Sequence, residues 1–140
     1  KVYAWEERFV AACDLTSIVF AQAQGMVDTI WAEFGLRFPP MVERLPRQAR
    51  STMADATRLS IRLPESSSSW WLLHELAHAM TSTADGQSDG HGPKFMGLYV
   101  KLLGRYLRLP VDTSLTSLEA ADIEVDVGAE PMFIDGLPVR

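Results

Sequence analysis

Residues 70–82, WWLLHELAHAMTS, are the segment that most limits how this chain can fold. The pattern predicts a helix that begins after a run of serines, with Ser68 or Ser69 as its N-cap. Because apolar side chains surround nearly its whole circumference, we expect this helix to be buried, with the rest of the chain packed around it. A charged side chain inside it, such as Glu75, is costly to bury unless it has a task.

The composition is that of an ordinary globular domain. The 140 residues suit one domain, with 47% hydrophobic and 22% charged residues. No apolar run approaches the roughly 18 residues that cross a membrane, so no membrane partner is expected. Cys13 stands alone, which excludes a disulfide framework and a cysteine-rich zinc ribbon and fits a reducing, cytoplasmic location. A leader removed from the start of the chain stays open.

The charge balance argues against a general nucleic-acid binder. The net charge is −5, and basic residues are scattered along the chain rather than gathered in one stripe. The local cluster Arg44–Arg50 is interpreted as a solvated loop. We therefore expect no clear nucleic-acid partner, and the oligomeric state is unknown.

A helical region is predicted at the start of the chain. Apolar residues recur at helical spacing over residues 4–34, and Asp14 or Thr16 can cap a fresh start after a break. Gly35 and the Pro39-Pro40 pair then end the region.

Short strands are expected next. Leu36–Phe38 alternates, and Leu59–Leu63 alternates with its leucines and Ile61 on one face. Pro64 ends that strand, and Ser66–Ser69 form a polar connector.

The second half of the chain adds one more long helix. After a loop over residues 83–92, Pro93 begins a helix that runs to about residue 108. We divide the chain into a domain at residues 1–109 and an acidic tail at 110–140, packed on or near it. Within this tail, residues 117–123 are expected to form one or two helical turns.

The central helix carries an H-E-x-x-H motif, His74-Glu75-Leu76-Ala77-His78. Four helical residues turn the chain by about 400°, so His74 and His78 lie one turn apart on one face and can share a metal ion. Glu75 projects about 100° from His74, beside the ion, where a general base can take a proton from water. Zinc is the ion that such imidazole pairs most often bind.

A catalytic zinc needs a third protein ligand, and His91 is the remaining histidine. It stands between Gly90 and Gly92, which allow a tight turn, after a loop long enough to bring it back over the helix. A carboxylate from Glu119 or Glu124 is an alternative third ligand that we rank well below His91. Chance histidines buried in a structural helix are the simplest alternative to any metal site.

Three further residues are weaker candidates for a role in the site. Asp85 or Asp89 can hold a ligand imidazole by its second nitrogen, although both also fit as turn formers. Tyr99 can face the site as a hydrogen-bond donor, but core packing with its hydroxyl at the surface is the preferred interpretation.

The segments HELAHAM and HGPKFMGLY, joined by a polar loop, resemble the SprT-like zinc metallopeptidases of the zincin superfamily. The similarity covers roughly residues 20–107, and the strand over residues 57–63 after an Arg-rich segment belongs to it. The resemblance implies that His74, His78 and His91 bind zinc and that Glu75 is the catalytic base. It also implies that strand 59–63 is the sheet edge that pairs with an extended peptide. The chain lacks the zinc ribbon and the basic regions of some members, so a DNA-linked role is not carried over.

We therefore expect an α+β fold, a single-domain minimal zincin with an N-terminal helix, a small mixed sheet, the metal-binding helix and a following helix. The expected function is that of a zinc metallopeptidase acting on a peptide or protein substrate. The rival from another class is a zinc-stabilised binding or toxin-like module without turnover. A latent form, in which an acidic segment such as 123–130 blocks the cleft, also stays open.

Overall fold

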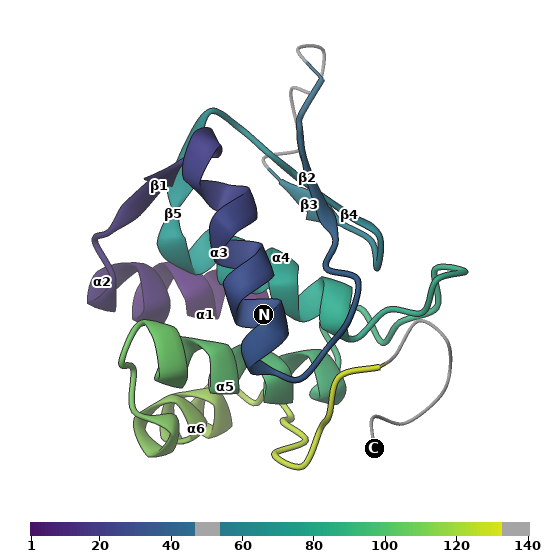
Figure 1. Ribbon diagram of the computed structural model, residues 1–140. Coiled ribbons are helices and arrows are strands. Elements are labelled where there is room, and N and C mark those ends of the chain that lie inside the picture. The colour runs from purple at the N-terminus through teal and green to yellow at the C-terminus, as the bar shows by residue number, and fades with distance from the viewer. Residues whose placement is uncertain (47–53, 133–140) are drawn as a thin grey trace.

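The computed structural model describes residues 1–46 and 54–132 of the chain, and these form an α+β fold, as predicted (Figure 1). The elements in chain order are α1 (Val2–Trp5), the π-helical turn η1 (Glu6–Val10), α2 (Ala11–Cys13), β1 (Ser17–Val19), α3 (Phe20–Glu33), β2 (Met41–Arg44), β3 (Asp55–Ala56), β4 (Ser60–Leu63), β5 (Ser66–Ser68), α4 (Ser69–Met80), α5 (Pro93–Tyr106) and α6 (Val111–Ala120).

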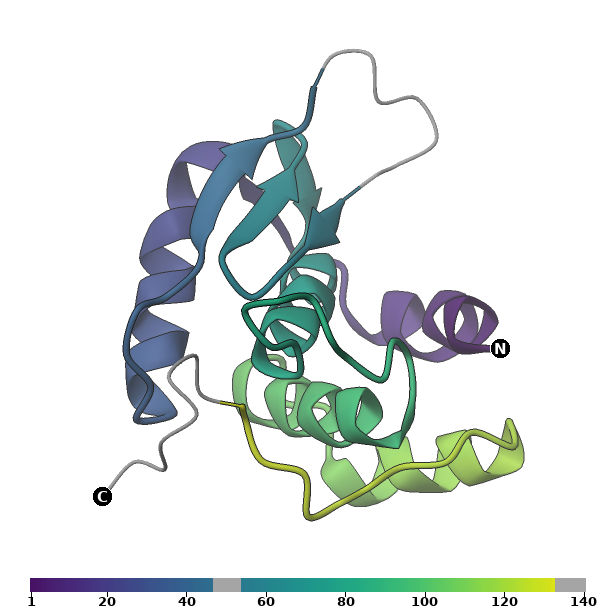
Figure 2. The same ribbon diagram turned by 90° about the vertical axis from the view of Figure 1, so that its right-hand side faces the viewer.

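The helix predicted from the central motif is α4, and it is buried as expected. It packs between the three-stranded sheet and α5, while α6 lies on the far side of α5 (Figure 2). Leu72, Leu76 and Met80 have no exposed surface, because neighbouring elements cover α4 on several sides. Ser68 occupies the N-cap position, and the hydroxyls of Ser69 and Thr16 are hydrogen-bonded to each other over 2.8 Å.

The mixed sheet has the strand order β2-β4-β3, with β2 parallel and β3 antiparallel to β4. Ile61 and Leu63 point into the core, but Leu59 is 53% exposed and was wrongly assigned to the same face. Leu59 precedes β4, in a turn where the Thr57 hydroxyl accepts its N–H. The expectation that residues 59–63 form a sheet edge is also wrong, because β4 is the central strand of this sheet.

Two other local predictions are wrong because side chains far along the sequence decide the backbone path. Leu36–Phe38 forms no strand: the indole N–H of Trp31 and the guanidinium of Arg58 hold the carbonyls of residues 37 and 38 in a turn. Ser66–Ser68 is strand β5 rather than a connector, since it pairs with β1 in antiparallel register. Within the Arg44–Arg50 cluster, Arg47 and Arg50 lie outside the described residues.

The predicted break in the N-terminal helical region is confirmed. Asp14 leaves helical geometry, and its Oδ1 accepts hydrogen bonds from the N–H and the hydroxyl of Thr16. The chain then forms β1 before α3 begins, a strand that periodicity alone did not predict.

Residues 111–132 pack along α5. Helix α6 starts earlier than the predicted turns at 117–123, buries Leu118, and accepts a hydrogen bond at Ser117 from the indole of Trp5 over 2.9 Å. The following segment is fixed by backbone hydrogen bonds from Asp126 to Pro93 and from Met132 to Met80. Across the described ranges, no helix has both the length and the apolar character needed to cross a bilayer.

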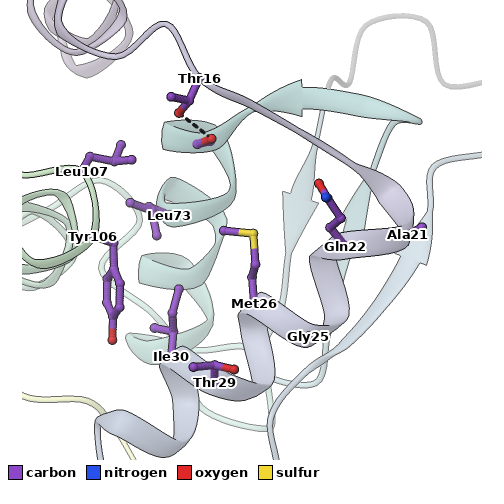
Figure 3. A pocket seen from close by; sticks show the side chains of 11 residues that line it. Thr16, Ala21, Gln22, Gly25, Met26, Thr29, Ile30, Leu73, Tyr106 and Leu107 are labelled. Atoms are coloured by element: carbon purple, nitrogen blue, oxygen red, sulfur yellow. Dashed lines mark hydrogen bonds between the residues drawn. The ribbon is translucent and has the colours of Figure 1, made fainter.

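A cavity of about 830 Å³ opens between α3 and the end of α5 (Figure 3). Met26 and Ile30 from α3, Leu73 from α4 and Tyr106 from α5 line it, together with Gly25. No histidine lines this cavity, so it is distinct from the histidine site described below.

Two helical glycines differ in what surrounds them. A Cβ on Gly97 of α5 would lie 1.9 Å from the carbonyl oxygen of Asp126, so only glycine lets this segment approach the helix. A Cβ on Gly25 of α3 would meet nothing within 4 Å.

Gly97→Ala should therefore lower the free energy of unfolding by about 1–3 kcal/mol, the usual effect of overpacking. Gly25→Ala, the matched control, should raise it by about 0.5–1 kcal/mol through helix propensity alone. Urea denaturation of both variants checks this, and equal effects of the two substitutions would contradict the packing argument.

Candidate metal centre

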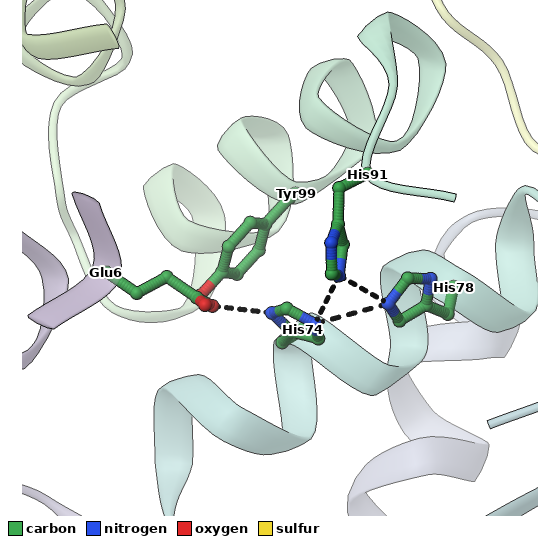
Figure 4. Close-up of polar contacts among 5 residues, drawn as sticks. All are labelled: Glu6, His74, His78, His91 and Tyr99. Atoms are coloured by element: carbon green, nitrogen blue, oxygen red, sulfur yellow. Dashed lines mark hydrogen bonds and ion pairs between the residues drawn. The ribbon is translucent and has the colours of Figure 1, made fainter. Parts of the chain in front are cut away.

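Three imidazoles meet at one point beside α4 (Figure 4). His74 and His78 lie one turn apart on α4, and His91 comes from the turn before α5. The Nε2 atom of His78 is 3.2 Å from that of His74 and 3.1 Å from that of His91, and the third side of the triangle is 3.2 Å. The structure thus brings together the three histidines that the sequence singled out.

This triangle has the dimensions that a metal ion requires. Nitrogens bound at about 2.0–2.1 Å in tetrahedral geometry lie about 3.3 Å from each other. The group formed by His74, His78 and His91 can therefore hold a metal ion.

Three neighbouring residues determine the backbone conformation around His91. Gly90 adopts a φ of 63°, a left-handed conformation that favours glycine. Pro93 occupies the first turn of α5, and the Asp89 carboxylate accepts the backbone N–H groups of Lys94 and Phe95. These contacts fix the start of α5 and hence the place of His91.

Asp89 therefore caps a helix instead of holding an imidazole. Asp85 accepts a hydrogen bond from the Thr83 hydroxyl within the loop, so neither predicted aspartate contacts a ligand ring. The metal-binding group includes no carboxylate among the described residues, so Glu119 and Glu124 do not replace His91.

The residue that orients His74 is Glu6, which sequence reasoning missed. Its Oε2 atom lies 2.5 Å from Nδ1 of His74 and accepts the Tyr99 hydroxyl over 2.7 Å. With Nδ1 as the donor, the lone pair of His74 is left on Nε2, facing the centre of the triangle. Glu6 is 2% exposed, so this contact is shielded from water.

The preferred interpretation of Tyr99 as a core residue is confirmed, but its hydroxyl has neither of the positions predicted for it. Its ring is fully buried, and its hydroxyl donates to Glu6 rather than reaching the surface or remaining available to a substrate. Burial and the Glu6 carboxylate raise the pKa of Tyr99 well above its usual value, so it remains a donor. Tyr99 and His74 together satisfy the Glu6 carboxylate.

Burial favours the neutral form of His78 and His91. It lowers the pKa of His78 to about 3, with further lowering from His74 and His91. Burial also lowers the pKa of His91. Metal ligation needs neutral imidazoles, so this environment prepares the site for a cation.

Glu75 is the one carboxylate of the motif, and it is 4% exposed. Burial raises its pKa to about 7, while His74 and a hydrogen bond from the Trp71 side chain act in the opposite direction. Asp55 of the edge strand β3 also acts on this carboxyl. The Glu75 carboxyl group is thus buried within reach of the charges on His74 and Asp55.

Two aromatic rings border the triad on different sides. Phe95 is fully buried and lies 5.0, 4.3 and 5.0 Å from the ring centroids of His74, His78 and His91. Tyr3 is 66% exposed and lies near two of the ligand rings. Phe95 therefore covers the buried side, and Tyr3 borders the side open to solvent.

The segment after α6 does not cover this open side. Its hydrogen bonds to elements other than α6 go to Lys1, Pro93, Lys101 and Met80, and none in the described part of the chain reaches a ligand histidine. The contacts give no support to a site blocked by residues 123–130.

Comparison of the chain with protein-family models, with curated proteins and with solved structures finds no match. The resemblance to SprT-like metallopeptidases therefore stays a prediction, and the assignment of roles depends on the geometry of the site.

Glu6→Gln removes the negative charge behind His74 and should weaken metal affinity about 10- to 100-fold. Competition with a chromophoric zinc chelator measures this. Glu33→Gln is the matched control, because Glu33 also accepts a tyrosine hydroxyl, that of Tyr106, away from the histidines. Equal affinities in the two variants would show that Glu6 does not support the site.

Proposed function

We propose that this protein is a zinc-dependent metallopeptidase in which His74, His78 and His91 hold the ion and Glu75 is the general base. The observation that carries the proposal is the triangle of Nε2 atoms with sides of 3.1–3.2 Å, formed beside a buried carboxyl group. A purely structural site would have no use for Glu75, whose burial is unfavourable without a function.

Zinc is the ion that this donor set favours. Three imidazoles without a thiolate form a known catalytic ligand set for zinc, and three protein ligands leave a position for water or substrate. Bound zinc lowers the pKa of water to about 7 and polarises a carbonyl group.

The chain's own residues then move the protons. Glu75 takes a proton from the attacking water as the new C–O bond forms, and gives it to the amide nitrogen as the C–N bond breaks. A base that works near neutral pH needs a pKa near that pH, and burial raises the pKa of Glu75 to about 7. Glu6 meanwhile keeps His74 in the tautomer that binds the ion.

The sheet supports a peptide or protein as the substrate. β3, rather than β4, is the edge strand next to α4, and Asp55 on it is close enough to influence Glu75. An extended peptide can add to such an edge through main-chain hydrogen bonds, which would align it along the triad.

His91→Ala should abolish stoichiometric zinc binding at micromolar zinc, because only two of the three ligands remain. Elemental analysis after dialysis against buffered zinc measures this. The wild type should retain about one zinc ion per chain. A wild type without zinc, or a variant that retains it fully, would refute this ligand set.

Glu75→Gln should keep the zinc and lower turnover by at least about 100-fold, since the amide cannot accept the proton. The assay is cleavage of a peptide found in a library digest with the wild type. Glu119→Gln, an exposed glutamate on α6, should leave both zinc and turnover unchanged. A fully active Glu75→Gln variant would exclude Glu75 as the base.

A further inference from the structure

Tyr3 has an unusual position for an exposed aromatic residue. Its ring stacks on His74 with centroids 6.1 Å apart and an interplanar angle of 12°, and it meets the His91 ring edge-on at 5.1 Å. An exposed tyrosine that packs on two ligand rings borders the triad on its solvent-exposed side.

The position of Tyr3 is fixed through its own helical segment. Tyr3 and Glu6 are three residues apart in the continuous helical run of α1 and η1, so they share one face. Glu6 lies behind His74, where it accepts the ring N–H, and Tyr3 lies alongside the same ring. Val2 and Trp5 are buried in the core and anchor the segment. The packing of Val2 and Trp5 in the core and the contact of Glu6 with His74 therefore fix the position of the Tyr3 ring relative to the His74 ring.

The hydroxyl group of Tyr3 is uncommitted. The other two tyrosines, Tyr99 and Tyr106, donate to Glu6 and Glu33, whereas Tyr3 donates to no partner within the residues that the structure describes. Core packing does not explain it either, because 66% of the residue is exposed. A free donor next to the triad is available to a bound substrate.

We propose that Tyr3 is a catalytic residue whose hydroxyl donates a hydrogen bond to the carbonyl oxygen of the scissile amide, an inference that rests on the proposed peptidase function. As the oxygen of water bonds to the carbonyl carbon, the π pair of the C=O bond moves onto the carbonyl oxygen, which becomes negatively charged. The Tyr3 hydroxyl stabilises this charge without transferring its proton. When the C–N bond breaks, the C=O bond re-forms and the hydrogen bond weakens again.

The test is Tyr3→Phe, which keeps the ring on the histidines and removes only the hydroxyl. Loss of one donor of this kind lowers kcat about 100- to 1000-fold. KM should change little, since the charge develops only during the reaction. Zinc affinity and the unfolding midpoint should match the wild type, because the hydroxyl makes no contact with the ligands.

A binding measurement provides a readout other than turnover. A phosphinic peptide presents a charged tetrahedral oxygen in place of the scissile carbonyl, and Tyr3→Phe should bind it at least about 10-fold more weakly than the wild type. Tyr106→Phe is the matched control and should leave kcat and phosphinic-peptide binding unchanged, because its hydroxyl contacts Glu33 far from the triad.

The outcomes separate the two proposals. Wild-type kcat and wild-type phosphinic-peptide binding in Tyr3→Phe would overturn the role of Tyr3 and leave the peptidase proposal intact. Loss of zinc in Tyr3→Phe would also overturn it, since the residue would then be structural. A wild type that binds zinc but cleaves nothing in the library refutes the peptidase proposal, and with it a catalytic role for Tyr3. The phosphinic-peptide comparison then decides whether the hydroxyl contacts an anion at all.

Discussion

The contact between the His74 imidazole and the Glu6 carboxylate is the interaction on which the rest of the site depends. Both side chains are nearly inaccessible to water, at 5% and 2% exposure, so neither can be buried without the other. The pair joins helical segments 68 positions apart and requires α1 and η1 to pack against α4. Tyr99 completes the arrangement by donating to the same carboxylate oxygen.

This arrangement explains why an apolar interior can hold so many polar groups. Burial favours the neutral form of His78 and His91, and the rings of all three ligand histidines pack on Phe95 as an aromatic side chain would. A bound cation would bring positive charge to the centre of the three imidazoles. Helix α4 is thus an apolar element with one polar stripe. This stripe carries His74 and His78 and faces α1 and the start of α5.

Local sequence signals predicted the elements whose structure depends mainly on residues close together in the sequence. Periodicity located α4 and α5, Pro93 marked the start of α5, and the spacing of His74 and His78 placed them on one face. Glu6 gave no such signal, because its role depends on a residue far along the chain. Strand β5 was missed for the same reason: a run of serines has no pattern of its own, and its structure comes from pairing with β1. Leu59 was misplaced because its N–H donates to the Thr57 hydroxyl in the bend before β4, so the strand begins one residue later than predicted.

The partners of the N-terminal helical segment have a consequence for the order of folding. Trp5 bonds Ser117, Lys1 pairs with Asp122, and Glu6 binds His74, so the N-terminal helical segment finds its contacts 68 to 121 positions further along the chain. Contacts of such long sequence separation form slowly, because the entropy of closing the intervening loop is lost first. During synthesis on the ribosome, the histidines of α4 emerge well before Ser117 does. A nascent chain therefore exposes its ligands before the packing that encloses them is complete, and the site matures only after α6 has been translated.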